Sequence, residues 1–444
     1  MKSSTVLCAL IAASTPSICA ATEVAATPPL GWNSWDCYGT TVTEAEVKAN
    51  ADYMAKHLKQ HGWQYVVIDI QWSEPNAQAH GYRPGAQLAM DEYGRLIPAV
   101  NRFPSASEGR GFRPLADYIH GLGLRFGIHI MRGIPRQAVK ANLAVKGSPA
   151  RAADIADTAS ICPWNTDMYG VDLSRPGAQG YYDSILELYA GWGVDYIKAD
   201  DIARPAHREE IAALHRAIAK TGRPIVLSLS PGPAMVKDVA FLQENANMWR
   251  ISDDFWDDWK ALRLNFILMS IWSGVARPGA WPDADMLPLG RIGIRAERGE
   301  NRMTRFKREE QRTLISLWSI AQAPLMFGGD LPSNDDFTLS LISNDEVLAV
   351  DQHGSHGGAF AEGSDSVVWT ADGPSGNEKY VAVFNVGDSR PIDVRVDWAA
   401  LKLPERCLLR DLWERKDIGA VSGGYAFRVL PHRSGLYRVK ATEN

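Results

Sequence analysis

Cysteine is scarce in this chain, with five residues in 444. Cys8 and Cys19 lie in an N-terminal leader-like segment, and Cys37, Cys162 and Cys407 are an odd, widely spaced set that argues against a disulfide scaffold. No Cys-x-x-Cys or His-x-His pair occurs, and the ten histidines are scattered. We therefore expect no zinc site and no other metal.

Basic stripes and long apolar runs are also missing. The formal net charge is -5, so nucleic acid is not an expected partner. The apolar run at residues 6–13 is too short to span ~30 Å of hydrocarbon, and Pro16 interrupts the segment, so no membrane anchor is expected. With the early cation Lys2 and small residues up to Ala21, this segment predicts a bacterial-type signal peptide over residues 1–21. We expect an exported protein, periplasmic or extracellular after cleavage.

Short apolar runs alternate with helical patterns over residues 22–350. The runs cover residues 28–35, 65–72, 124–131, 194–200, 224–230, 246–252, 280–287 and 323–331. Eight such units predict an α/β fold, a (β/α)8 TIM barrel. No Gly-x-Gly-x-x-Gly turn follows the first run, so a dinucleotide cofactor is not expected.

The hydrophobic pattern of the sequence changes over residues 351–444. Short alternating runs separated by Gly, Pro, Asp and Ser predict a small antiparallel β-sandwich domain; they cover residues 366–373, 379–388, 391–398, 406–413 and 434–441. A structural cap is its favoured role, and a separate sugar-binding module is the alternative.

Charged residues fall inside runs that otherwise predict buried strands. In "VDYIKAD", alternation puts Lys198 and Asp200 on one face and the apolar Ile197 and Ala199 on the other, toward the helices. Lys198 and Asp200 must then point into the barrel. A structural ion pair between them is one explanation. The other is an active site, because barrel enzymes keep theirs at the C-terminal ends of the strands.

Further charges occupy the same ends of other strands: Asp69, Arg250, Asp253, Asp254, Asp283 and Asp285. Tryptophans are abundant near them: Trp32, Trp35, Trp72, Trp249 and Trp281. Carboxylates and cations bind hydroxyl groups, and indole faces stack on the C–H side of a pyranose ring, so the pattern is typical of a sugar pocket. Any single tryptophan among these is still more often a core residue.

Two carboxylates suffice for glycoside hydrolysis. A carboxylate kept ionised beside Lys198 suits a nucleophile, which favours Asp200. An acid near an exposed rim can shuttle a proton, which fits Asp254, although spacing alone leaves Asp253 open.

These motifs resemble glycoside hydrolase family 27, the α-galactosidase and α-N-acetylgalactosaminidase family. The resemblance rests on "TPPLGWNSW", "YIKADD", "WRISDDFW", "WPDADML" and "AQAPLMFGGDL" and covers nearly the whole chain after the leader. It implies a (β/α)8 barrel followed by a β-sandwich, two aspartates acting with retention of configuration, and no metal. It also implies Asp200 as nucleophile and Asp254, not Asp253, as acid/base. The sugar-binding residues it implies are Trp32, Asp69, Lys198, Arg250 and Asp285.

The chain departs from the family pattern where the substrate is selected. Family α-galactosidases usually have two consecutive aspartates at the end of the second strand, whereas Ile70 follows Asp69 here. His129 takes the place of the usual third-strand tyrosine, and Ser230 takes the place of the fifth-strand glutamate or its equivalent near the 2-position. We expect both to bind the substrate. Cys162 lacks its usual cysteine partner, because Ile202 stands there.

The segment "GIHIMRGIPRQAV" resembles a branch acting on both α-galactosides and β-L-arabinopyranosides. The leading expectation is therefore an exo-glycosidase acting on terminal α-D-galactosides of plant glycans. A β-L-arabinopyranosidase and an isomaltose-type α-glucosidase are the alternatives. From another class, a non-catalytic glycan-binding barrel is disfavoured because both carboxylates are present.

Overall fold

The computed structural model describes residues 24–442. The predicted leader, residues 1–21, lies outside the described residues. No helix in the described part of the chain is long and apolar enough to cross a membrane.

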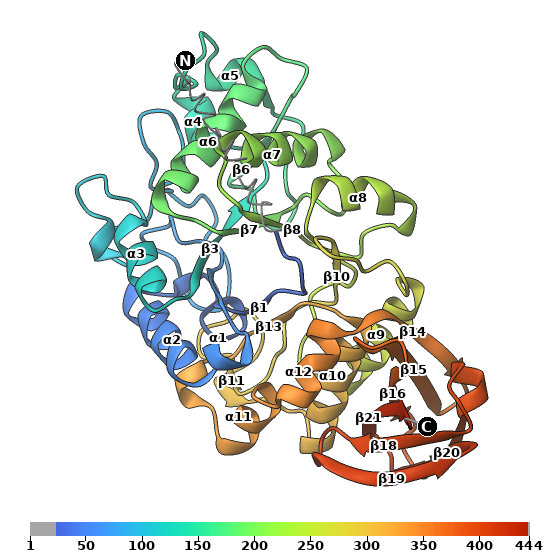
Figure 1. Ribbon diagram of the computed structural model, residues 1–444. Coiled ribbons are helices and arrows are strands. Elements are labelled where there is room, and N and C mark those ends of the chain that lie inside the picture. Colours follow the sequence, from blue (N-terminus) through green and yellow to red (C-terminus); the bar gives the residue numbers. More distant parts are fainter. Residues whose placement is uncertain (1–23, 443–444) are drawn as a thin grey trace, which may run out of the picture.

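Eight parallel strands form a curled sheet surrounded by helices, in the order β10-β9-β8-β7-β3-β2-β1-β13 (Figure 1). A parallel bridge between Leu287, just past β10, and Phe327 on β13 closes the barrel. The strands are β1 (Leu30–Asn33), β2 (Tyr65–Ile68), β3 (Arg125–Met131), β7 (Tyr196–Asp200), β8 (Val226–Leu229), β9 (Met248–Arg250), β10 (Trp281–Asp283) and β13 (Leu325–Phe327). Each of the eight predicted runs contains one of these strands, so the predicted TIM barrel is confirmed.

A helix follows each barrel strand, as right-handed crossover connections require. These helices are α2 (Glu44–His57), α3 (Arg113–Gly121), α6 (Ala178–Trp192), α7 (Arg208–Thr221), α8 (Val239–Asn245), α9 (Trp259–Ile271), α10 (Arg308–Ala321), and α11 (Asp336–Ile342) with α12 (Asp345–His353). The α2 helix starts at a capping box in which Thr43 and Glu46 bond each other's backbone N–H groups.

The two faces of the barrel strands bury different side chains. Tyr65 and Tyr196 belong to an apolar cluster inside the barrel. Their strand neighbours Val66 and Ile197 belong to the larger cluster shared with the helices. Alternation along β7 therefore turns Lys198 and Asp200 inward, as the sequence predicts.

The chain ends in an antiparallel β-sandwich, which lies beside α9 and α10 (Figure 1, red). Its larger sheet has the order β14-β15-β16-β21-β18-β19, and its smaller sheet pairs β17 with β20. The strands are β14 (Ser355–Glu362), β15 (Ser366–Asp372), β16 (Glu378–Asn385), β17 (Ile392–Asp397), β18 (Arg406–Asp411), β19 (Lys416–Ser422), β20 (Gly424–Val429) and β21 (Ser434–Ala441).

Candidate active site

A cavity of about 220 Å³ opens at the C-terminal ends of the barrel strands. Its lining comes from strand ends and the loops that follow them: Trp35, Asp69, Ile70, Tyr82, Trp164, Lys198, Asp200, Arg204, Ser230, Pro231, Arg250, Asp253, Asp254, Glu297 and Arg298. This is the end of the barrel where the fold places its active sites. Most of the predicted site residues therefore meet in one cavity.

Asp200 is the last residue of β7, and its side chain is 14% exposed. The His129 Nε2 lies 3.1 Å from its Oδ2, and the backbone N–H of Asp201 donates to its Oδ1 at 2.9 Å. Burial raises the pKa of a carboxyl, but the hydrogen bond from His129 and the charges of His129 and Lys198 outweigh it and hold the Asp200 pKa well below its usual range. Asp200 is therefore an ionised carboxylate on the wall of the cavity.

Lys198 pairs with Asp69 rather than with Asp200. The Lys198 ammonium donates to Asp69 Oδ2 at 2.8 Å, and the Asn33 side-chain amide donates to the same oxygen at 2.8 Å. Burial favours the neutral amine, but Asp69 and Asp200 raise the Lys198 pKa above its ordinary value. The sequence left open an ion pair between Lys198 and Asp200. In the structure Lys198 pairs with Asp69 instead, and this pair faces the cavity.

Arg250, at the end of β9, contacts two carboxylates. Its Nη2 lies 2.7 Å from Asp285 Oδ2 and 3.3 Å from Asp254 Oδ1. The side chain of Asp254 is 37% exposed, while that of Asp253 is 65% exposed and pairs with Arg204 at 3.0 Å. Of the two neighbouring aspartates, Asp254 is the one that lies beside Arg250, and Asp253 turns toward the rim.

Asp285 is buried behind Arg250 and does not line the cavity. Burial raises its pKa to about 7; Arg250 opposes this rise, and Asp254 reinforces it. The backbone N–H of Phe255 donates to Asp285 Oδ2 at 2.7 Å. Asp285 therefore orients Arg250 and the start of the loop after Asp254.

His129 and Ser230 lie on either side of Asp200. His129 is buried on β3 beside it. Ser230 lines the cavity just past β8, and its buried hydroxyl helps to lower the pKa of Asp200. The hydroxyl thus belongs to the cavity wall beside this carboxylate.

The prediction that Trp32 contributes to the sugar-binding wall is wrong. Trp32 is fully buried in the layer between barrel and helices, where its indole N–H donates to the Gly329 carbonyl at 2.8 Å. Within β1 it is Asn33 that points inward, to Asp69, so alternation turns Trp32 outward. Trp35, three residues later, lines the cavity instead.

Aromatic rings from three separate segments, each following a barrel strand, form one wall. Tyr82 stacks on Trp35 with 5.9 Å between ring centroids and packs against Trp164 at 5.7 Å. Ile70 lines the cavity beside this wall. Sequence reasoning missed Tyr82 and Trp164 because irregular loops show no periodicity. Their only signal is that they follow strands β2 and β3 in the chain.

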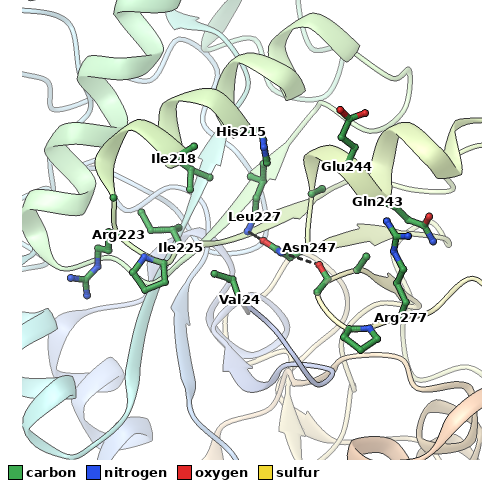
Figure 2. Close-up of a pocket in the computed structure, with 17 residues that line it drawn as sticks. Val24, His215, Ile218, Arg223, Ile225, Leu227, Gln243, Glu244, Asn247 and Arg277 are labelled. Atoms are coloured by element: carbon green, nitrogen blue, oxygen red, sulfur yellow. Dashed lines mark hydrogen bonds between the residues drawn. The ribbon is translucent and has the colours of Figure 1, made fainter. Parts of the chain in front are cut away.

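A larger cavity, of about 940 Å³, lies at the N-terminal ends of β8 and β9, the opposite end of the barrel, and Figure 2 shows the residues that line it. Its lining includes Val24, and also Ile225 and Asn247, which directly precede β8 and β9. The Asn247 side-chain amide already has partners within the protein, because its N–H donates to the Gly279 carbonyl and its oxygen accepts from the Leu227 N–H. Among the described residues that line it, Glu244 is the one carboxylate, so this part of the chain offers no pair comparable to Asp200 and Asp254.

Two family models match this chain. The model described as alpha galactosidase A matches residues 171–353, and the model of the alpha galactosidase C-terminal beta sandwich domain matches residues 363–439. The α-galactosidase of Coffea arabica is 30% identical over 93% of this chain and 93% of its own length.

Three solved structures resemble this protein over nearly its whole chain. A family 27 β-L-arabinopyranosidase from Geobacillus stearothermophilus is 55% identical, with a TM-score of 0.93, over 95% of this chain and 98% of that one. A variant of that enzyme, crystallised in complex with arabinose, gives 54% identity and the same TM-score over 95% of this chain and 99% of that one. A structure described as a putative α-N-acetylgalactosaminidase from Bacillus halodurans is 51% identical, with a TM-score of 0.85, over 94% of this chain and 98% of that one. This chain therefore belongs to glycoside hydrolase family 27, the α-galactosidase family, and is a glycoside hydrolase.

Proposed function

We propose that this protein is a retaining exo-glycosidase that removes terminal β-L-arabinopyranose from plant glycans, with terminal α-D-galactose as a second substrate. The observation that carries the proposal is Ile70, an apolar side chain in the cavity wall directly after Asp69. The two sugars share ring stereochemistry, and only galactose has a C6 hydroxymethyl group. An apolar wall at this place gives no hydrogen bond that would favour galactose.

The order of the two substrates reverses the leading expectation from sequence. The identity of 55% to a β-L-arabinopyranosidase, against 30% to an α-galactosidase, supports the change. Isomaltose-type cleavage has no observation in its favour.

In the proposed mechanism Asp200 attacks the anomeric carbon while Asp254 donates a proton to the leaving glycosidic oxygen. A covalent glycosyl–enzyme ester forms and the aglycone leaves. Asp254, now ionised, takes a proton from water, which attacks the same carbon and releases Asp200. Two inversions give net retention. The lowered pKa of Asp200 supports the nucleophile role, because it keeps the carboxylate free of a proton.

The remaining cavity groups bind the sugar in this proposal. Lys198, Asp69, Arg250 and Ser230 hold ring hydroxyls, and Trp35 covers the C–H face, the role first expected of Trp32. His129 and Asp285 act through their neighbours by orienting Asp200 and Arg250.

Alanine variants of the two aspartates test the mechanism. Asp200→Ala is expected to lose about 10³-fold or more of kcat/KM, and azide is expected to restore turnover with a product of inverted configuration.

Asp254→Ala should lose much more kcat/KM on natural disaccharides than on activated aryl glycosides, because acid assistance matters most for poor leaving groups. Asp253→Ala is the matched control, with near-normal rates. A silent Asp254→Ala with an impaired Asp253→Ala would exchange the two roles.

Ile70→Asp tests the substrate. We expect the wild type to cleave both aryl glycosides, with kcat/KM values within about two orders of magnitude and arabinopyranoside ahead. The variant should move the ratio toward galactoside, because the new carboxylate can accept a hydrogen bond from the C6 hydroxyl. A wild-type preference for galactoside far above a hundredfold, unchanged in the variant, would contradict the role given to Ile70.

We also propose that the protein is exported and cleaved after Ala21, on the strength of the leader pattern alone. N-terminal sequencing of the secreted or periplasmic enzyme checks this, and a mature chain that still begins at Met1 would contradict it.

A further inference from the structure

An exposed tryptophan lies at the mouth of the active-site cavity. Trp164 lines this cavity and is 37% exposed. Its neighbours Cys162 and Asn165 are buried, and the Asn165 side-chain oxygen accepts the Asp167 backbone N–H at 3.0 Å. The segment that carries Trp164 is therefore fixed, while the indole itself offers an apolar face to a ligand.

Trp164 is the outermost member of the aromatic wall. Trp35 is 7% exposed, and Tyr82 stacks on it with 5.9 Å between ring centroids. The Trp164 ring follows, with its centroid 5.7 Å from that of Tyr82. The three rings thus lead from the inside of the cavity to its mouth. Because Trp35 is assigned to the terminal sugar, Trp164 is left for the group attached to that sugar.

The leaving group departs toward the same mouth. In double displacement the nucleophile and the acid flank the bond that breaks, so the leaving oxygen faces the acid. The Asp200 side chain is 14% exposed and that of Asp254 is 37% exposed, so the acid lies nearer to solvent than the nucleophile. The cavity, of about 220 Å³, is also smaller than the ~300–1,000 Å³ typical of ligand sites. It therefore suits a single terminal sugar, and the aglycone must lie at the mouth.

We propose that Trp164 is the platform on which the aglycone stacks, and that the aglycone is itself a pyranose. This inference rests on the proposed function and adds the second sugar to it. Exposed Glu297 and Arg298 line the same cavity from the loop after β10, four strands away from β3 in the barrel order. A pyranose has a C–H face for the indole and hydroxyl groups for a carboxylate and a guanidinium. A methyl aglycone offers neither.

Two substrates with poor leaving groups test the platform. One is a disaccharide with β-L-arabinopyranose on a pyranose aglycone, and the other is methyl β-L-arabinopyranoside. Both depend on acid assistance, so they differ chiefly in the aglycone ring. The wild type is expected to favour the disaccharide by about tenfold or more in kcat/KM. Trp164→Ala is expected to remove about tenfold of this preference, the size of one aromatic contact.

Two further variants serve as controls. Trp164→Phe should retain most of the preference, because a phenyl ring still stacks on the sugar. Tyr118→Ala is the matched control: Tyr118 is also 37% exposed, but it lies on α3 and does not line the cavity. It should leave kcat/KM unchanged on both substrates.

The ratio of kcat/KM between the two substrates distinguishes a platform from a structural residue. A Trp164→Ala variant that loses kcat/KM equally on both would show a structural tryptophan and overturn the proposal. A wild type without any preference for the disaccharide would overturn it as well. A wild type that cleaves galactosides but no arabinopyranosides would instead contradict the proposed order of substrates, and the same comparison with methyl α-D-galactoside and an α-galactosyl disaccharide then tests Trp164. Failure of the platform is thus distinguishable from failure of the proposed activity.

Discussion

Three buried charges beside the sugar cavity each have an opposite or hydrogen-bonding neighbour. Lys198 lies against Asp69, Arg250 against Asp285, and Asp200 against His129. Unpaired charges would be costly to bury, so these pairs let the barrel carry a charged cavity. They also set the protonation state of each carboxyl, which is what the chemistry requires.

His129→Phe is expected to move the acid limb of the kcat/KM profile to higher pH. The folded-state pKa of Asp200 is lowered, so its ionised form is lost only as pH falls through that low value. A hydrogen bond to a charged group contributes ~1.5–3 kcal/mol, so without His129 the pKa should rise by about 1–2 units. The pH profile on an activated aryl glycoside measures this shift.

His120→Phe is the control, because His120 bonds Asp195 away from the cavity. It should leave the acid limb in place. An acid limb that stays put in His129→Phe as well would mean that His129 does not control the Asp200 carboxylate.

The sequence predicted the charged part of the site better than its aromatic part. Asp69, Lys198 and Asp200 were predictable because a charge inside a buried strand needs a functional or structural reason. Trp32 and Trp35 could not be told apart by residue type, since an indole suits both a core and a sugar platform. The structure decides between them: Asn33 points into the barrel, so its strand neighbour Trp32 must point outward.

At the scale of elements, a buried arginine joins the ends of β3, β7 and α7. Arg132 Nε donates to the Asp201 carbonyl at 2.8 Å, Nη2 to the Asp201 carboxylate at 2.7 Å and Nη1 to Glu210 at 2.9 Å. Tyr182 donates to Glu210 from helix α6. The residue directly after Asp200 is thereby fixed to two other elements.

Arg132→Ala is expected to lower the free energy of unfolding by about 3–5 kcal/mol, because it leaves Asp201 and Glu210 buried without their cation. Urea denaturation measures the change. The control is Arg428→Ala, which removes an exposed pair with Asp393 and should cost less than about 1 kcal/mol. Equal effects of the two substitutions would contradict the structural role of Arg132.

The barrel strands were predictable as elements because each is a continuous apolar run between helical patterns. The sandwich strands β15, β16, β17, β18 and β21 were predictable from alternation. The strands β14, β19 and β20 were not predicted. Of these, β14 and β19 are the two edges of the larger sheet and are mostly exposed. An exposed edge needs no apolar side chains and so leaves little signal.

At the scale of the whole molecule, barrel and sandwich share one hydrophobic core. Trp369, Phe384 and Leu436 from the larger sheet belong to the same buried cluster as the barrel helices. The other face of that sheet packs on the smaller sheet in a separate cluster that includes Phe427. A continuous apolar run such as that of β16 indicates a sheet that is buried on both faces, but not which face contacts the barrel.

The shared core predicts that both parts unfold together. Phe384 on β16 meets Phe266 on α9 edge to face, with 4.9 Å between ring centroids. Phe384→Ala should cost about 3–5 kcal/mol, because it opens a cavity at the contact between the two parts. Heating the variant should shift the loss of glycosidase activity and the loss of far-UV circular dichroism to lower temperature by the same amount.

Phe427→Ala, a substitution inside the sandwich, should shift both signals together as well, since one cooperative unit responds as a whole. Two separate transitions, with activity surviving the melting of the sandwich, would show that the barrel does not depend on the second domain.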